Sequence, residues 1–311
     1  MLLARLTAYT QNFGLSSTAQ RSGSGSYRRG ESEGAFLSGF TGHADAATPT
    51  HVLLEIRGLS VRFGGIQALD NLSFSVPRSC ICSLIGPNGA GKTTLFNCLS
   101  RLYPVQRGGL FYEGRPLSGI PVSKLAALGI SRTFQNLAIF RSMSVRENIL
   151  VGAHSLARGG FLTHMLRPDW VRKQEDDLIC SVDALMRRLQ LIDVADRLAG
   201  ELPLGTQKRV EFARALASRP KLLLLDEPAA GLNLTELEAL GELIRQTRDE
   251  LGITILLVEH HMPFVMRISD TIVALHFGRK IAEGSPQEIR RHPEVIRAYL
   301  GYEDRATDAL A

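Results

Sequence analysis

Short apolar runs alternate with amphipathic helical patterns along most of this chain, beginning near Val52. Runs bounded by Gly, Pro or Asn predict strands at 53–56, 72–76, 81–85, 222–225, 253–258 and 271–275. The runs at 222–225 and 253–258 are almost wholly apolar, which is typical of strands covered on both faces. Because helical periods separate such strands, the pattern predicts an α/β layered fold with a mostly parallel sheet.

The helical signals are clearest between about residues 136 and 205, a stretch without strand signals that we interpret as a helical insertion. Apolar residues lie on one face of a predicted helix at Leu178, Val182, Leu185 and Leu189. Ser144 and Glu147 have the spacing of a capping box that opens another helix. Farther on, Ser285 followed by Pro286 predicts the start of a short C-terminal helix.

The two ends of the chain differ from its middle. Residues 1–50 are rich in Gly, Ser and Arg and have little hydrophobic periodicity, so we expect a flexible extension that the chemistry does not need. Residues 51–305 are predicted to form one domain, which contains the motifs described below. Residues 306–311 are expected to be a C-terminal tail.

Composition narrows the class of protein. The 311 residues are 44% hydrophobic and 22% charged, as in soluble globular proteins, and no apolar run approaches the roughly 18 residues that cross a bilayer. The net charge of +5 is scattered along the chain, so no nucleic-acid partner is expected. The cysteines, which match no metal-binding pattern, are interpreted as buried free thiols: Cys80, Cys82, Cys98 and Cys180.

A phosphate-binding motif follows the predicted strand at 81–85. The run from Gly86 to Thr93 fits G-x-x-x-x-G-K-[ST] and precedes a predicted helix, which is the context that the motif requires. Its glycines allow successive backbone N–H groups to point at phosphate oxygens. Lys92 is predicted to neutralise the β- and γ-phosphates, and the Thr93 hydroxyl to bind Mg²⁺. The predicted ATP-binding residues of this loop are Gly86, Pro87, Asn88, Gly89, Ala90, Gly91, Lys92, Thr93 and Thr94.

A second motif supports the first. The strand at 222–225 ends in Asp226 and Glu227, and the carboxyl ends of parallel strands face the ligand crevice in such folds. Asp226 is predicted to hold Mg²⁺ through water. Glu227 is predicted to act as the general base that polarises the attacking water. No Asn is followed by Lys, so the Asn-Lys-x-Asp motif of guanine-specific GTPases is absent from the sequence.

With these motifs, residues 52–302 resemble the nucleotide-binding subunits of ABC transporters, a family of P-loop ATPases. The resemblance implies a mostly parallel sheet with a small antiparallel β subdomain and a helical insertion. Phe63 stands where the family stacks an aromatic ring on adenine, although alone it would more often be a core residue. Gln135 matches the glutamine that senses Mg²⁺ and the lytic water. His260 matches the switch histidine at the γ-phosphate, and 231–233 match the loop that touches the opposite subunit.

The family signature Leu-Ser-Gly-Gly-Gln is replaced here by Leu202-Pro203-Leu204-Gly205-Thr206. Gly205 still allows a backbone N–H to approach phosphate, and Thr206 is a candidate helix cap. In the family, ATP lies between the phosphate loop of one subunit and the signature of the other. We therefore expect an intact site on this chain and a weakened half-site for its partner. The resulting hypothesis is an asymmetric heterodimer, with a homodimer as the open alternative.

Further runs resemble the longer ATP-binding subunit of branched-chain amino-acid importers, among them 132–135, 226–233 and 289–301. This resemblance implies a second ATP-binding subunit, two transmembrane permeases and, indirectly, a periplasmic solute-binding protein. It also implies a peripheral position on the cytoplasmic face of the inner membrane. Importers of urea or another small solute remain alternatives. A soluble ABC-type ATPase of translation or repair is a further alternative, although the single phosphate loop argues against the usual two-domain form.

Overall fold

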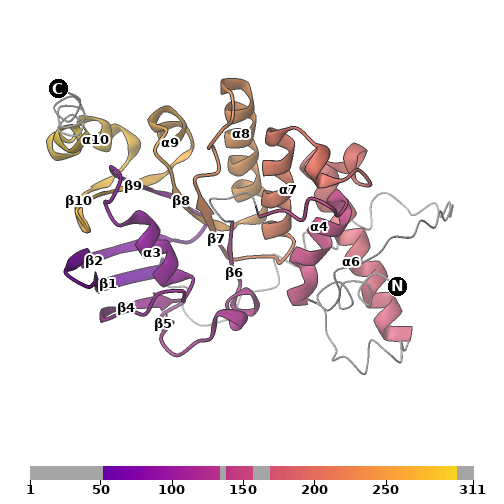
Figure 1. Cartoon of the computed structure of the whole chain (residues 1–311), viewed down its shortest axis with the longest axis horizontal. Coiled ribbons are helices and arrows are strands. Elements are labelled where there is room, and N and C mark those ends of the chain that lie inside the picture. The colour runs from indigo at the N-terminus through magenta and orange to yellow at the C-terminus, as the bar shows by residue number, and fades with distance from the viewer. Residues whose placement is uncertain (1–51, 134–137, 157–168, 300–311) are drawn as a thin grey trace.

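The computed structural model describes residues 52–133, 138–156 and 169–299, which form two sheets and the helices around them (Figure 1). The antiparallel sheet has the order β2-β1-β4-β5 and the larger sheet the order β10-β9-β3-β8-β7-β6. The first contains β1 (Val52–Phe63), β2 (Ile66–Pro77), β4 (Arg107–Tyr112) and β5 (Arg115–Pro116). The second contains β3 (Ile81–Ile85), β6 (Ile130–Arg132), β7 (Leu222–Asp226), β8 (Thr254–Val258), β9 (Thr271–His276) and β10 (Arg279–Gly284).

The larger sheet is parallel except at its β10 edge, where β10 pairs antiparallel with β9. Its central strands β3, β7 and β8 are buried along their whole length. Alternate residues of β7 enter different cores: Leu223 and Leu225 pack with the helices on one face, Leu222 and Leu224 with α3 and the antiparallel sheet on the other. Burial on both faces is the reason that these strands are continuous apolar runs.

The helices form two groups in space. The first has α3 (Lys92–Leu99), α8 (Leu234–Leu251), α9 (Met262–Ile268) and α10 (Pro286–Arg291), which accompany the parallel sheet. The second has α4 (Val145–Gly152), α6 (Asp169–Arg188) and α7 (Leu204–Leu216), which lie beyond β7 (Figure 1). Short 3₁₀ turns connect them at Val122–Lys124, Ala126–Leu128, Ala153–Leu156, Ile192–Val194 and Ala199–Glu201.

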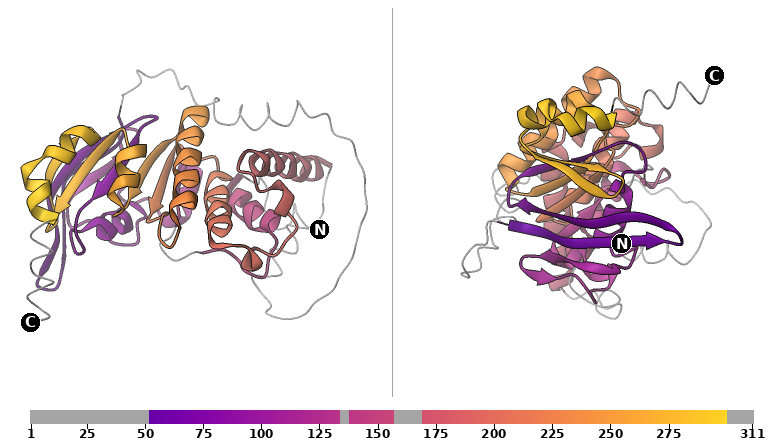
Figure 2. Two further views of the ribbon diagram at one scale, coloured as in Figure 1. Left: turned by 90° about the horizontal axis from the view of Figure 1, so that it is seen from above. Right: turned by 90° about the vertical axis from the view of Figure 1, so that its left-hand side faces the viewer.

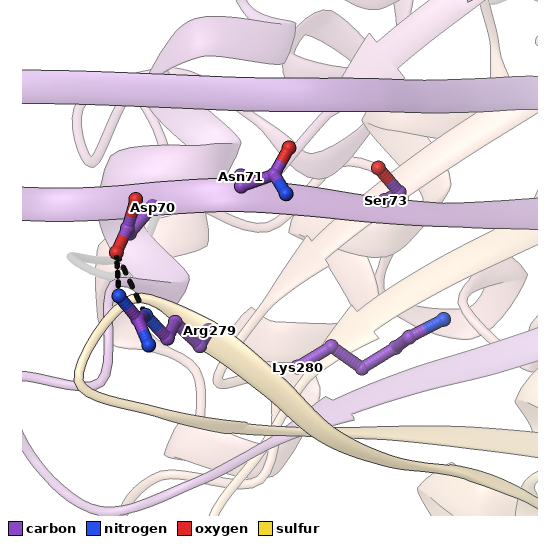
Figure 3. Close-up of a pocket in the computed structure, with 5 residues that line it drawn as sticks. All are labelled: Asp70, Asn71, Ser73, Arg279 and Lys280. Carbon is purple, nitrogen blue, oxygen red and sulfur yellow. Dashed lines mark hydrogen bonds and ion pairs between the residues drawn. The ribbon is translucent and has the colours of Figure 1, made fainter.

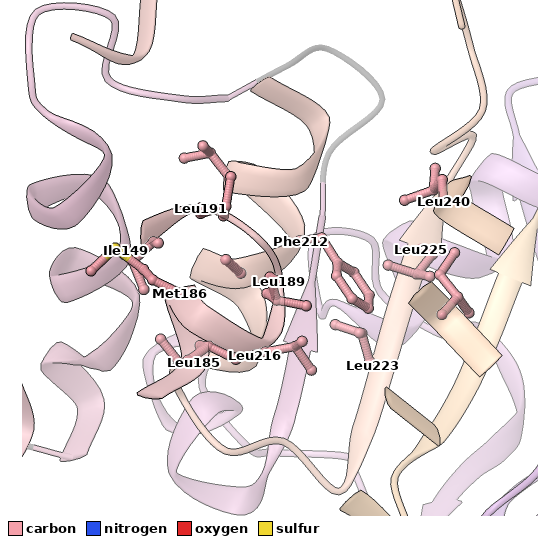
Figure 4. Packing of buried hydrophobic residues seen from close by; sticks show 14 of the residues in the cluster. Ile149, Leu185, Met186, Leu189, Leu191, Phe212, Leu216, Leu223, Leu225 and Leu240 are labelled. Carbon is pink, nitrogen blue, oxygen red and sulfur yellow. The ribbon is translucent and has the colours of Figure 1, made fainter. Parts of the chain in front are cut away.

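The second group of helices is joined to the parallel sheet by one continuous apolar core. Figure 4 shows Ile149 of α4 and Met186 of α6 at one end of this core, with Phe212 of α7 beside Leu223 of β7 at the other. Val182, Leu185 and Leu189 are buried in it, as the helical period predicted. Helix α7 therefore connects the helical region mechanically to the strand that ends at Asp226.

The two sheets touch at the β2–β10 edge, which Figure 2 shows side by side in its right-hand view. The backbone N–H of Asp70 donates to the carbonyl of Gly278 at 2.9 Å. The carboxylate of Asp70 also accepts a hydrogen bond from Arg279 Nε at 2.7 Å (Figure 3). These contacts fix the antiparallel sheet against the parallel one, above the phosphate loop.

Several local predictions are confirmed, and others need correction. The predicted capping box of Ser144 and Glu147 is present at α4, and Ser285 is the N-cap of α10 with Pro286 in its first turn. Strands β1 and β2 are 12 residues long each, far longer than the predicted cores, because their second face carries polar residues. Of the cysteines, all free, Cys180 is only half-buried instead of buried. Within the described ranges, no helix is both long and apolar enough to cross a bilayer.

Candidate nucleotide-binding site

The phosphate loop connects β3 to α3 and requires glycine for steric reasons. Gly86 has φ +148° and Gly91 has φ +100°, values that residues with a Cβ rarely adopt. A Cβ on Gly86 would lie 2.3 Å from the carbonyl oxygen of Leu275, and one on Gly91 would lie 2.6 Å from that of Ala68. These clashes are with backbone, so no side-chain movement relieves them. The loop conformation therefore depends on the glycines that the motif predicted.

Lys92 is the first residue of α3 and is buried. Its ammonium donates hydrogen bonds to the carbonyl oxygens of Gly86 at 2.5 Å and Pro87 at 3.0 Å, so it lies inside the curve of the loop. Burial lowers the pKa of Lys92, and the nearby charges of Glu227 and Asp226 oppose that change. A cation held at the N-terminus of a helix suits the polyphosphate of a nucleotide. Along the same loop Asn88, Gly89 and Thr93 are exposed, Pro87 and Thr94 are partly buried, and Ala90 is buried.

Asp226 is the last residue of β7 and is 3% exposed. Its Oδ2 accepts a hydrogen bond from Arg132 Nη2 at 2.7 Å. Burial raises the pKa of Asp226, while the hydrogen bond and charge of Arg132 act in the opposite direction. A buried carboxylate needs such a partner, because an unpaired one would be protonated instead of charged. Arg132, on β6, was not singled out by the sequence analysis.

Glu227 follows directly and has an unusual backbone conformation, with φ +48°. Its N–H donates to the carbonyl of Val258 at 2.9 Å, which ties the ends of β7 and β8 together. His260, just beyond β8, therefore comes close: its Nδ1 lies 3.9 Å from Glu227 Oε1. The Glu227 side chain is 22% exposed and that of His260 is 60% exposed. The structure thus brings together the predicted base and the predicted switch histidine at the open edge of the sheet.

Glu259 is a second carboxylate at this edge that sequence reasoning missed. It is fully buried and accepts backbone hydrogen bonds from Ala229 at 2.8 Å, His260 at 3.0 Å and His261 at 3.3 Å. It therefore holds the loop after Glu227 against the loop that carries His260. An acidic residue that directly follows a wholly apolar strand is the signal that marks such a position. The next residue, His261, caps α9 by accepting at Nδ1 from the N–H of Phe264.

Phe63 ends β1 and is 43% exposed, so the alternative reading of it as a core residue is wrong. Its ring meets that of Tyr103 edge to face, with the centroids 5.1 Å apart. That contact orients the ring while leaving a face accessible, as stacking on a base requires. Gln135 lies outside the described residues, as do the predicted extension at residues 1–50 and the predicted tail at 306–311.

The atypical signature lies at the start of α7, which Figure 1 shows on the other side of β7 from α3. Gly205 is packed against α8: a Cβ there would be 2.6 Å from Glu236 Oε1. Thr206 does not cap the helix, contrary to our suggestion. Its hydroxyl accepts from Arg209 instead, and among the described residues no side chain caps α7. Among the described residues, no hydrogen bond joins Gly205 to the phosphate loop of its own chain.

The site contains oxygen atoms suited to a magnesium ion. Thr93 lies at the exposed start of α3. Oδ2 of Asp226 accepts the hydrogen bond from Arg132, whereas Oδ1 has no hydrogen-bond partner among the described residues. Hydroxyl and carboxylate oxygens are the ligand types that Mg²⁺ prefers, usually together with waters and substrate phosphates. The residues therefore fit the ion that the motif predicts.

Comparison with protein families identifies this architecture. A model of ABC transporters matches residues 69–230, and a model of branched-chain amino acid ATP-binding cassette transporters matches residues 279–305. The chain is 44% identical over 249 residues to the high-affinity branched-chain amino acid transport ATP-binding protein LivG of Salmonella typhimurium, covering 80% of this chain and 98% of that protein. It is 42% identical to BraF of Pseudomonas aeruginosa, with the same coverage.

Solved structures agree with the sequence comparison. A crystal structure of an ATP-binding cassette of an ABC transporter in its ADP conformation aligns with a TM-score of 0.71 at 30% identity, covering 81% of this chain and all of that one. A nucleotide-free cassette aligns with a TM-score of 0.69 at the same identity. The predicted P-loop fold is thereby confirmed. This chain belongs to the ABC transporter family and is one of its ATP-binding, ATP-hydrolysing subunits.

Proposed function

We propose that this chain powers an importer of branched-chain or related hydrophobic amino acids. The observation that carries the proposal is the match of residues 279–305 to a C-terminal model specific to branched-chain amino-acid cassettes, together with the names of the relatives. The transported solute does not touch an ATPase subunit in the scheme proposed here, so the assignment depends on this family-specific segment. The same match favours this subgroup over importers of urea.

For the chemistry, we propose that the chain binds ATP at the loop between β3 and α3. Backbone N–H groups of Gly86 to Thr94 and the ammonium of Lys92 hold the phosphates, and Phe63 stacks on the adenine. Glu227 accepts the proton of the attacking water, which its position at the sheet edge beside His260 supports. His260 contacts the γ-phosphate. Gln135 links the bound nucleotide to the helical region.

We further propose that Thr93 and Asp226 hold Mg²⁺, with Gln135 as an additional ligand. When bound, the ion neutralises charge on the phosphate oxygens. The contribution of the chain is to keep the Asp226 carboxylate ionised and aimed at the loop, which the bond to Arg132 supports. The hydroxyl of Thr93 is fixed by the first turn of α3.

The proposed assembly contains a second ATP-binding subunit and two transmembrane permeases, and it receives solute from a periplasmic binding protein. This chain sits peripherally on the cytoplasmic face of the inner membrane. ATP bound to its loop is covered by the signature of the second subunit, while Gly205 covers the site of that subunit. Binding closes the pair and hydrolysis reopens it, which is a shift between two states with different affinities for the nucleotide.

The test is transport by the reconstituted complex. The chain is purified in mild detergent with the permeases and ATPase that accompany it, and the complex is placed in lipid vesicles with its solute-binding protein. We expect leucine, isoleucine or valine to stimulate phosphate release and to enter the vesicles, and urea to do neither. Stimulation by urea alone would overturn the assignment of the solute, and recovery without permeases would overturn the transport function.

A further inference from the structure

The guanidinium of Arg132, on β6, connects α3 to the end of β7. Its Nη2 donates to Asp226 Oδ2 at 2.7 Å, and its Nη1 donates to Asn97 Oδ1 and Ser100 Oγ, each at 2.9 Å. The side chain is 10% exposed and its guanidinium carbon lies 5.5 Å from the centre of the Phe96 ring. Arg132 is thus held by α3 on one side and by the end of β7 on the other.

The partners of Arg132 on α3 share a face with the proposed magnesium ligand. Asn97 is four residues after Thr93, and Ser100 is seven residues after it. Residues at i, i+4 and i+7 lie along one stripe of a helix. A group that grips Asn97 and Ser100 therefore fixes the rotation of the stripe on which Thr93 lies. The same group grips the carboxylate of Asp226.

We propose that Arg132 is a positioning residue for the magnesium site: it fixes Asp226 and the Thr93 face of α3 relative to one another, so that both oxygen donors are preorganised for one ion. The proposal rests on the proposed Mg²⁺ site. Its physical basis is that a planar guanidinium offers several donors in a rigid fork, whereas the ammonium of lysine is a point charge. Preorganisation raises affinity because fewer groups must be ordered when the ligand binds.

Arg132 also ends β6, the strand that precedes residues 134–137. Displacing it would therefore disturb the spacing of α3, β6 and β7 together. A purely structural ion pair would make a different prediction, since it would affect unfolding without affecting the ion. The chain offers a matched pair for that comparison: Arg248 is 15% exposed and pairs with Asp270, whose Oδ2 also accepts from the N–H of Ile81 at 2.7 Å. That pair lies at the start of β3, whereas the phosphate loop follows the end of the same strand.

The experiment measures the affinity of the full-length chain for a fluorescent ATP analogue, once with millimolar Mg²⁺ and once with EDTA. The quantity compared is the gain in affinity that Mg²⁺ confers. We expect Arg132→Gln to lose that gain by roughly tenfold, which corresponds to about 1.4 kcal/mol, with the affinity in EDTA unchanged. Arg132→Lys is expected to keep part of the gain. Arg248→Gln is expected to lower the melting temperature while keeping the whole gain.

The outcomes separate this inference from the proposals on which it rests. A normal gain in Arg132→Gln overturns the positioning role alone, as does an equal loss of affinity with and without Mg²⁺. No gain in the unmodified chain overturns the magnesium site and the inference with it. If Arg132→Gln does not fold, Arg132→Lys decides: a full gain contradicts the need for the guanidinium fork, and a partial gain supports it.

Discussion

Glu227 illustrates how a single residue is prepared for chemistry by backbone geometry. A left-handed φ costs energy for a residue with a Cβ, and such strain concentrates at functional sites. Here the cost is offset by the bond from the Glu227 N–H to Val258 and by the Glu259 carboxylate, which fixes Ala229 two residues later. The result is a half-buried carboxylate at the open edge of the sheet, directed near His260.

Replacing Glu227 with Gln should separate binding from hydrolysis. The amide keeps the shape of the side chain but is not a base, so we expect nucleotide binding within about twofold of the original and phosphate release lowered by at least roughly 10²-fold. Equilibrium binding of ATP and a phosphate-release assay on the assembled complex measure the two quantities. Unchanged hydrolysis would show that another group activates the water.

The four cysteines should differ sharply in reactivity. Burial raises the pKa of Cys80 and of Cys98 to about 11 and raises that of Cys82 well above its usual range, whereas Cys180 on α6 is only half-buried. At pH 8 a thiol of pKa about 11 is roughly 0.1% thiolate, the reactive form. We expect iodoacetamide to label Cys180 first in the native protein, as read by peptide mass spectrometry. Equal labelling of Cys80 would contradict the burial on which this depends.

At the scale of elements, burial decides what a sequence reveals. Strands β7 and β8 were predicted to within two residues because both faces are covered and four of the five positions in each strand are apolar. Strands β4 and β10 were not predicted, because they carry charged or small residues. Each lies at or next to an edge of its sheet or pairs with only a short partner, where no continuous apolar run is required.

The candidate site shows the same division between local and distant information. The phosphate loop was predicted because its function depends on consecutive residues, each constrained by backbone geometry. Arg132 and Glu259 were not, because their partners are remote: Arg132 meets Asp226, 94 positions away, and Glu259 meets Ala229, 30 positions away. One sequence carries no sign of such pairings until the fold brings the strands together.

The turn between β4 and β5 yields a prediction about pH. Glu113 in this turn pairs with Lys221 at 3.0 Å, before β7, and with Arg78 at 3.0 Å, after β2. Burial alone would raise the pKa of Glu113, but the bonds to Lys221 and Arg78 outweigh it and lower the pKa. A lowered pKa in the folded state stabilises the protein above the unfolded pKa, and the stabilisation disappears as pH falls through the folded value.

Glu113→Gln should therefore cost stability only where the carboxylate is charged. We expect a loss of about 0.5–1 kcal/mol in the free energy of unfolding near pH 7, because the pair is partly exposed, and a loss that shrinks as pH falls below the ordinary pKa of glutamate. Urea unfolding at several pH values measures it. Arg57, whose pair with Glu55 is exposed, offers a control: Arg57→Gln should change stability little at any pH. A difference at Glu113 that grows in acid would reverse the sign and refute the argument.

At the scale of the whole molecule, the site is divided between regions that the fold keeps apart. Lys92, Asp226, Glu227 and His260 follow β3, β7 and β8 at one edge of the sheet. Gly205 lies in the first turn of α7 and packs against Glu236 of α8. In the assembly proposed above, a signature placed there serves the site of the second subunit.

The two halves can be tested separately in the assembled complex. In a heterodimer whose partner site is the weaker one, Glu227→Gln removes most phosphate release, whereas Gly205→Asp disturbs only the half that this chain donates. The Asp side chain would meet Glu236, which already lies where a Cβ would go, so it distorts the signature by both contact and like charge.

In a homodimer the Gly205 variant would damage both sites equally and hydrolysis would fall as far as with Glu227→Gln. We expect a much smaller fall for Gly205→Asp, measured as phosphate release per complex with melting temperature as a check on folding. If Gly205→Asp abolishes hydrolysis in a folded complex while Glu227→Gln leaves it intact, the asymmetric arrangement is wrong.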